Sequence, residues 1–564
     1  MNQPGVSTGA PEESNRRKVT MYRNGSIYTA ADPFATAMVV DGDTVAWVGS
    51  EQAATSIADS SMEIIDLRGA LLAPGFVDSH MHLTETGLAA SGLDLAGVRS
   101  SQELLDAVAS ASGTGAILGH GWDETAWHRS TLPTLEEVDR AAGGRPVYLS
   151  RIDVHSALIS SSLAAAAGLK GMDGFEAEPG ASGSGGGVTT AQVRRAAHSA
   201  ARRVARELPE SERRDYQERA LREAAANGYV ALAEMSAPHI CGPDDLRMAI
   251  SWNEAPAYPQ VLPYWGELAT SEEHAGAILQ QMGGNVLGLA GDLNIDGSLG
   301  SRTAALSHGY SDAPEERGSL YLSVDQAAAH LAATSALGVQ AGFHVIGDAG
   351  LGAVLDALDM AASDVGEQRI RAAGHRLEHV ELADAEAIDR LAKYSVTVSV
   401  QPVFDAAWGG PGGLYEQRLG DRSKAMNPFA SFYAKGVPVT FGSDSPVTPL
   451  RPWSSVRACL EHSNPEQRIS ARAAFLGHTR AGWRASKHRN PLMGQLVPGA
   501  PASFAVWEVE ELMVQVADSR VQSWSTDPRA RTPLLPALDT GKDPVCLQTV
   551  REGHELFAAA SLRE

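Results

Sequence analysis

The most constraining feature of this chain is an alternation of apolar, β-rich runs with alanine-rich stretches of helical character. This alternation is typical of a parallel sheet whose strands are joined by crossover helices. Eight strand–helix units are enough to close a (β/α)₈ barrel, the TIM barrel. We therefore expect an α/β protein with such a barrel as its main body.

Eight runs of the chain fit the expected barrel strands. They occupy residues 74–82, 229–235, 258–264, 289–296, 339–345, 375–380, 396–402 and 437–444. The gap between the first two runs is far longer than one crossover needs. We therefore expect residues 84–215 to form an insertion over the active-site mouth of the barrel.

Short alternating segments separated by turn residues lie near both ends of the chain. The N-terminal examples are VTMYRNGSIYT and ATAMVVDGDTVAWVGS, and PLMGQLVPGAPASFAVWEV has the same character. Such segments predict β-hairpins. We expect residues 17–73 and 490–555 to pair into one small β-sandwich domain that flanks a barrel domain at 74–489. Residues 1–16 are expected to be a disordered N-terminus.

Charge and composition exclude several classes of partner. The 46 basic and 68 acidic residues leave a formal net charge of −22, which argues against nucleic acid and anionic membrane surfaces. Neither a signal peptide nor an eighteen-residue apolar run is found, so we expect no membrane segment and a cytoplasmic location. The three cysteines are widely spaced, so a metal would have to bind histidines and carboxylates.

Metal-ligating residue types recur at the carboxyl ends of the expected strands. His80 and His82 end the first strand in GFVDSHMHL, and their spacing of two directs both rings to the same side. His344, His379 and Asp444 stand at the ends of three later strands. Because catalytic residues of such barrels gather at these strand ends, a shared metal site is favoured over isolated structural histidines.

The sequence also resembles a known family along nearly its whole length. The resembling segments are GFVDSHMHL, GHGWDETAW, RIDVHSALISSSLA, IDGSLGSRTAAL, FHVIGDAG, RLEHVEL, FGSDSPV, HTRAGWRAS and GQLVPGAPASFAVW. They are similar to the amidohydrolase superfamily, in the branch of YtcJ-like proteins and N-substituted formamide deformylase, amidohydrolase family 3. The resemblance implies four histidine ligands and one carboxylate ligand, which are His80, His82, His344, His379 and Asp444.

Catalytic roles follow from the same resemblance. Asp444 would be both a metal ligand and the group that transfers the proton, and His379 would belong to the catalytic set. Imidazole and carboxylate ligands suit a divalent ion, Zn²⁺ above all, which lowers the pKa of water towards neutrality. The ion would make hydroxide available for attack on a carbonyl carbon.

One position departs from the family pattern. Members with two metals commonly carry a carbamylated lysine on the fourth strand, where this chain has Asp292. Because the carboxylate stem is one carbon long, we expect it not to reach where a lysine carbamate reaches. One ion is favoured and two remain open, with Glu234 as an alternative bridging acid. Asp292 also fits a polar position of the barrel core.

Several residues are candidate substrate contacts, each with a structural alternative. The resemblance implies that His155 reaches over the substrate. Aromatic residues could line an apolar pocket, and Arg302 could meet a substrate carboxylate or form a structural salt bridge. The candidates are His155, Trp122, Asp123, Trp127, Arg302, Trp408 and Tyr415.

We interpret the chain as a metal-dependent hydrolase of a non-peptide C–N bond in an amide, a formamide or another N-acyl compound. Its partner would be a small-molecule substrate, and a homodimer is an open alternative to a monomer. A hydrolytic deaminase of a cyclic amidine is the nearest enzymatic alternative, because the same hydroxide can attack an amidine carbon. A non-catalytic binding or regulatory barrel is the alternative from another class.

Overall fold

The computed structural model describes residues 18–175, 190–513, 533–539 and 541–562. The expected disordered start at 1–16 lies outside these residues, as do residues 514–532 of the expected C-terminal sandwich segment. Among the residues described, no helix is both long and apolar enough to cross a membrane.

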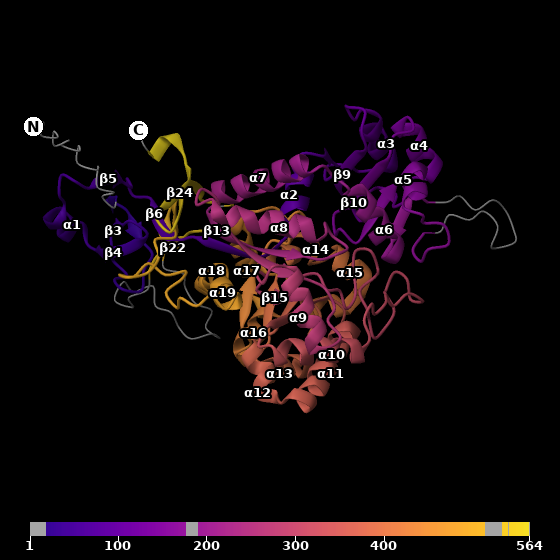
Figure 1. Cartoon of the computed structure of the whole chain (residues 1–564). Helices are drawn as coiled ribbons and strands as arrows, with labels where there is room; N and C mark the ends of the chain where they lie inside the picture. Colours follow the sequence, from indigo (N-terminus) through magenta and orange to yellow (C-terminus); the bar gives the residue numbers. More distant parts are fainter. Residues whose placement is uncertain (1–17, 176–189, 514–532, 540, 563–564) are drawn as a thin grey trace, which may run out of the picture.

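Eight parallel strands form the central sheet, in the spatial order β19-β18-β17-β16-β15-β14-β13-β7. In chain order they are β7 (Phe76–Met81), β13 (Tyr229–Ser236), β14 (Gln260–Trp265), β15 (Gly288–Leu289), β16 (Gln340–Val345), β17 (Arg376–His379), β18 (Thr397–Val400) and β19 (Val439–Phe441). Each overlaps one expected run. The α/β class and the barrel are therefore confirmed (Figure 1).

Within the described residues, fourteen helices surround or extend this barrel. They are α2 (Leu83–Ala89), α7 (Glu210–Ala226), α8 (Pro243–Ser251), α9 (Glu272–Gln281), α10 (Val324–Ala336), α11 (Asp348–Val365), α12 (Glu367–Ala373), α13 (Ala385–Tyr394), α14 (Pro402–Trp408), α15 (Leu414–Leu419), α16 (Phe429–Lys435), α17 (Pro452–Glu461), α18 (Ala471–Gly477) and α19 (Arg480–Ala485). Local sequence marks their starts: α10 begins with a capping box between Ser323 and Gln326.

Short 3₁₀ turns are η1 (Glu124–Ala126), η2 (Trp252–Glu254), η3 (Gly420–Ala425), η4 (Pro465–Gln467) and η6 (Ala560–Leu562).

The barrel strands are buried on both faces, which explains why they read as continuous apolar runs. Phe343, Val398 and Phe441 of the strands belong to one apolar cluster with Leu355 and Leu391 of the surrounding helices. This core holds the strand ends in place, so side chains that follow the strands are rigidly positioned.

The barrel closes between its first and last strands, beside two of the candidate ligands. The backbone N–H of Asp444 donates to the carbonyl of His80 at 2.7 Å. Two residues further along the chain, the N–H of His82 donates to the carbonyl of Ser445 at 2.9 Å. The hydrogen bonds that close the barrel therefore also set the separation of His80, His82 and Asp444.

Strand β15 is much shorter than the expected run 289–296. It is interrupted at Gly291, which has φ +108°, a conformation that L side chains rarely adopt. A Cβ on Gly291 would approach the carbonyl oxygen of Ser236 to 2.9 Å. The chain rejoins the sheet at Asn294, which bridges to His344. The bend between them carries Asp292 into the barrel mouth.

Both ends of the chain contribute to a β-sandwich, as expected. One sheet has the order β4-β3-β1-β5, and the other β2-β6-β20-β23-β24. Their bounds are β1 (Val19–Arg23), β2 (Ser26–Ile27), β3 (Ala37–Asp41), β4 (Thr44–Gly49), β5 (Glu63–Asp66), β6 (Leu71–Pro74), β20 (Phe504–Glu508), β23 (Val545–Arg551) and β24 (His554–Ala558), with helix α1 (Glu51–Ile57) and the pair β21 (Leu512–Met513) and β22 (Leu535–Pro536).

The two sheets share one apolar core. Strand β6 pairs antiparallel with β20, which joins the N-terminal and C-terminal segments directly. Tyr22 and Met38 of the first sheet cluster with Phe504 and Val550 of the second, and the rings of Tyr22 and Phe504 are 5.1 Å apart.

The long segment after β7 forms a sheet of its own, which the sequence analysis did not predict. Its order is β12-β11-β10-β9-β8, with helices beside it at one end of the molecule (Figure 1). The elements are β8 (Leu93–Asp94), β9 (Ile117–Trp122), β10 (Val147–Arg151), β11 (Ser156–Ile159), β12 (Gln192–Arg194), α3 (Ser101–Ala109), α4 (Leu135–Ala142), α5 (Ser161–Ala166) and α6 (Arg195–Ala205).

Candidate metal centre

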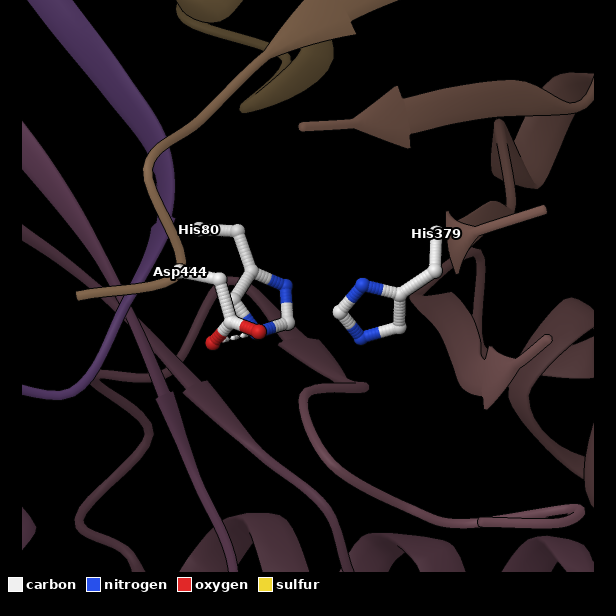
Figure 2. Close-up of side chains that lie close together, drawn as sticks. All are labelled: His80, His379 and Asp444. Carbon is white, nitrogen blue, oxygen red and sulfur yellow. Dashed lines mark ion pairs between the residues drawn. The ribbon is translucent and has the colours of Figure 1, made fainter. Parts of the chain in front are cut away.

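Six buried imidazole and carboxylate side chains meet at the carboxyl ends of the barrel strands. They are His80 on β7, His82 just after it, Asp292 after β15, His344 on β16, His379 on β17 and Asp444 after β19. Figure 2 shows His80 beside Asp444, with the ring of His379 pointing towards them. Parallel strands that end at the same rim bring together residues more than 300 positions apart in the sequence.

Asp444 lies against both histidines of the first strand. Its Oδ1 is 3.4 Å from Nε2 of His80 and 3.3 Å from Nε2 of His82. Candidate ligand atoms of His80, His379 and Asp444 all lie within 4.8 Å of one another. This separation suits side chains that surround a single small ion.

Asp292 joins the same cluster although its stem is only one carbon long. One carboxylate oxygen is 3.6 Å from Nε2 of His80 and 3.9 Å from Nδ1 of His344, and the other is 3.3 Å from Nε2 of His82. The bend at Gly291, which interrupts the regular strand, directs this short side chain towards the cluster. Asp292 belongs to two of the three candidate ligand groups.

Outer hydrogen bonds orient the histidine rings. His80 donates through Nδ1 to Glu378 at 2.8 Å, and His379 donates through Nδ1 to Gln401 at 2.8 Å. His344 donates through Nε2 to the carbonyl of Gly297 at 3.2 Å. Because one ring nitrogen of each of these three histidines is held in this way, the other nitrogen faces the cluster.

Glu378 was missed by the sequence analysis. Arg376 holds it with hydrogen bonds of 2.5 and 2.9 Å and also donates to the carbonyl of Ser79 at 2.7 Å. A signal was available, because Arg376 and Glu378 are opposite charges two residues apart in a strand that is otherwise fully buried. Charges in such a strand need partners inside the barrel.

The cluster leaves buried polar atoms without hydrogen-bond partners within the described part of the chain. They include Nε2 of His80, Oδ1 of Asp292 and Oδ1 of Asp444, all facing the cluster. Unpaired buried donors and acceptors are costly, so their convergence is best explained by a bound group. Imidazole nitrogen and carboxylate oxygen are ligands of Zn²⁺ and similar divalent ions, so these residues fit a metal.

Burial and the two carboxylates of the cluster set the protonation of its histidines. Burial and the neighbouring His344 lower the pKa of His379 to about 3, which keeps this ring neutral. Burial lowers the pKa of His82, but Asp292 and Asp444 raise it to about 10. Burial raises the pKa of Asp444, but His80 and His82 hold it well below its usual range. At neutral pH a metal ion would therefore have to displace a proton from His82, whereas the ring of His379 is already neutral.

Glu234 lies outside the three candidate ligand groups. Its Oε2 accepts a hydrogen bond of 2.6 Å from the backbone N–H of Leu83, the residue after His82. Burial raises the pKa of this carboxyl to about 7. Glu234 therefore anchors the start of α2 beside His82, where the sequence analysis had offered it as a bridging acid.

Two cavities adjoin the cluster, and His155 lines both. The smaller has a volume of about 30 Å³, and Trp408 and Tyr415 are among its walls, with His379 and Asp444. The larger has a volume of about 660 Å³ and reaches Asp292. The ring of His155 lies 4.9 Å from that of His344, so the insertion contributes directly to the mouth of the barrel.

Three of the expected substrate contacts lie elsewhere. Trp122 packs in the core of the insertion, where its indole N–H donates to the carbonyl of Leu149 at 2.8 Å. Asp123 pairs with Arg151 at 2.6 Å, and Arg302 pairs with Asp312 at 2.7 Å. These contacts satisfy internal charges and polar groups, which is the structural alternative for all three. Trp127 packs beside Trp122.

Comparison with known proteins identifies the family. Residues 63–557 match the model of the amidohydrolase family. The chain belongs to the amidohydrolase family. This confirms the resemblance seen in the sequence, and the metal-ligand types described above are those of a hydrolase that uses a metal ion.

Curated relatives match this amidohydrolase over most of their length. Protein LONG AFTER FAR-RED 3 of Arabidopsis thaliana is 27% identical over 520 residues, covering 86% of each chain. Putative amidohydrolase YtcJ of Bacillus subtilis is 26% identical, covering 79% of this chain and 84% of its own. N-substituted formamide deformylase of Arthrobacter pascens is 22% identical, covering 88% and 96%.

Solved structures show the same architecture. An uncharacterized metal-dependent hydrolase from Pyrococcus furiosus has a TM-score of 0.66 and 27% identity, covering 86% of this amidohydrolase and 98% of its own chain. One from Pyrococcus horikoshii has a TM-score of 0.67 and 25% identity, covering 88% and 98%.

Proposed function

We propose that this amidohydrolase uses a divalent metal ion to cleave a C–N bond other than a peptide bond, in an amide, a formamide or another N-acyl compound. The observation that carries the proposal is the convergence of six buried ligand side chains whose facing atoms lack hydrogen-bond partners among the described residues. The name of the deformylase from Arthrobacter pascens supports the same bond type.

The ion we propose is Zn²⁺, held by His80, His82, His344, His379 and Asp444. When bound, it would lower the pKa of water towards neutrality and polarise the substrate carbonyl. The sequence favoured one ion. Six candidate ligands exceed the four of a tetrahedral site, and Asp292 falls in two of the three groups, which supports a second ion. Metal content per chain decides between one ion and two.

Within this scheme the protein's own groups move the proton and orient the substrate. Asp444 accepts a proton from the attacking water and donates it to the departing nitrogen. Burial lowers the pKa of His155 to about 4, so its neutral ring can donate a hydrogen bond to the acyl oxygen. His379, hydrogen-bonded to Gln401, keeps its other nitrogen directed at the reacting centre.

The smaller cavity supports a short acyl group. Its volume of about 30 Å³ is far below the 660 Å³ of the larger cavity, so it has room only for a small group. Trp408 and Tyr415 make its wall aromatic and rigid. A formyl group fits this space better than a long acyl chain, so formamides are the first substrates to test.

The test is turnover by Zn²⁺-loaded protein on a panel of N-formyl and N-acetyl amines, cyclic amidines and esters. We expect amine release from the N-formyl compounds. Ammonia release from amidines alone would favour the deaminase, and inactivity on all classes would favour a binding barrel. Protein in which Asp444 is replaced, Asp444→Asn, serves as the matched control for contaminating hydrolases.

A further inference from the structure

The larger cavity is lined by a buried, positively charged side chain that the proposed hydrolysis at the metal centre does not use. Its apolar wall includes Leu293 and Leu320, and Asp292 and His155 connect it to the candidate ligands. Helix α6 also contributes to the wall, and its residue Arg202 lines the cavity although its side chain is only 8% exposed. A buried guanidinium beside a reaction centre needs a charged partner.

The carboxylate that Arg202 contacts is already paired with another arginine. Glu85 accepts hydrogen bonds from Arg206 on both oxygens, at 2.7 and 2.8 Å. The guanidinium of Arg202 is 3.5 Å from the same Glu85 and forms no hydrogen bond with the described part of the chain. Burial raises the pKa of Glu85, but Arg206 and Arg202 hold it well below its usual range. Two guanidinium groups therefore face one ionised carboxylate.

Other polar groups of this cavity do not cancel the remaining positive charge. Arg195 is paired with Asp173 at 3.2 Å. Burial and the neighbouring Arg202 lower the pKa of His198 well below its usual value and that of His239 to about 4, so both rings are neutral. Asp292 faces the candidate metal. One unmatched positive charge is left at the wall of the cavity.

We propose that Arg202 binds a carboxylate carried by the amine part of the substrate, so that the preferred substrates are N-acyl amines with one negative charge. This rests on the proposed hydrolysis of N-acyl compounds and names their class. One surplus positive charge matches one carboxylate, whereas a phosphate carries about −1.5 to −2 at neutral pH. The planar fork of a guanidinium also matches a planar carboxylate.

The geometry assigns each part of such a substrate to one cavity. The short acyl group would enter the smaller cavity beside Trp408, and the scissile bond would lie at the candidate metal centre. The amine part would extend along Leu293 and Leu320 towards Arg202. His155, which lines both cavities, would stand at their junction.

The test measures binding separately from turnover. The probes are N-methanesulfonyl derivatives of glycine, leucine and phenylalanine, whose sulfonamide resists hydrolysis, each compared with its neutral carboxamide. Calorimetry on the metal-loaded protein should give tighter binding of the carboxylate members by on the order of tenfold to a hundredfold, the range expected for charged hydrogen bonds.

Variants assign this preference to one residue. Arg202→Gln should abolish it, and Arg202→Lys should keep part of it through the charge alone. The control is Arg203→Gln, on the next residue of α6, which is exposed and should keep the preference. Thermal unfolding of each variant verifies that it is folded. The ratio of carboxylate to carboxamide affinity in the wild type is a separate measurement that does not depend on any variant.

Equal binding of carboxylates and carboxamides by the wild type would overturn the proposal, and so would an unchanged preference in folded Arg202→Gln. These outcomes are independent of the hydrolysis test. A carboxylate preference without turnover of any N-acyl amine would support the anion site and contradict the proposed reaction. Turnover of neutral amides without any preference would support the reaction and overturn the anion site.

Discussion

At the scale of single residues, Asp444 combines two positions that are usually separate. It contacts both histidines of β7, and it borders the smaller cavity that we assign to the acyl group. A carboxylate in this place can hold a metal and still reach the reacting water. Its loss should therefore affect proton transfer more than metal retention, because four histidines remain.

We predict that Asp444→Asn lowers kcat by on the order of a hundredfold to ten-thousandfold, the usual contribution of a general acid–base group. Most of the metal should stay bound. Initial rates and elemental analysis of the same preparation give both quantities, and Asp421→Asn, a change at an exposed position, is the control. Undiminished turnover would exclude Asp444 as the proton carrier.

Glu378 is the positioning residue with the most direct link to a candidate ligand. Glu378→Gln removes the charge that holds His80 in its tautomer, and we expect a loss of metal affinity of about tenfold to a hundredfold. Competition with a chelator measures it, with Glu386→Gln on the exposed side of α13 as control. Unchanged affinity would mean that the ring is oriented by other contacts.

The residues predicted from the sequence fall into two groups. His80, His82, His344, His379 and Asp444 were found because strand ends are visible in apolar patterns and the rule for barrel mouths is general. For Trp122, Asp123 and Arg302 the sequence left a structural role open, and their contacts with Leu149, Arg151 and Asp312 are tertiary ones. The spacing of residues along the chain does not indicate which side chains pair in the folded protein.

At the scale of elements, β15 shows where sequence periodicity stops being informative. The run at 289–296 reads as one regular strand, and the other seven strands overlap their expected ranges. Gly291 breaks this one because its φ of +108° is incompatible with a regular strand. The sheet of the insertion was missed for a different reason, since short strands between helices give weak alternation.

We predict that Gly291→Ala destabilises the protein by about 1–3 kcal/mol, because a Cβ there meets the carbonyl of Ser236 and the backbone conformation is strained. Metal affinity should fall with it, since Asp292 follows directly. The same change at Gly276, inside α9 with open space around it, should instead stabilise by roughly 0.5–1 kcal/mol. Urea denaturation compares the two, and equal effects would contradict the proposed role of the bend.

At the scale of the whole molecule, the elements are tied together by buried polar groups as well as apolar cores. Asp245 on α8 accepts a hydrogen bond of 2.7 Å from Thr84 on α2, and burial raises its pKa to about 6. Its pKa is therefore higher in the folded than in the unfolded chain. Its contribution to stability is complete below about pH 4 and is lost as the pH rises through 6.

We predict that wild-type protein loses about 1 kcal/mol more stability between pH 5 and pH 7.5 than Asp245→Asn does. The asparagine keeps the acceptor for Thr84 but has no charge to bury. Unfolding free energies at the two pH values measure the difference. Parallel pH profiles for the two proteins would show that Asp245 ionises in the folded state without cost.

The central claim is that the barrel mouth binds a divalent metal, and metal content per chain tests it most directly. Elemental analysis should find about one or two equivalents in reconstituted wild type. His80→Ala combined with His82→Ala should lose them, and His274→Ala combined with His308→Ala, at exposed positions, should retain them. Wild-type protein that binds no metal even after reconstitution would contradict the account.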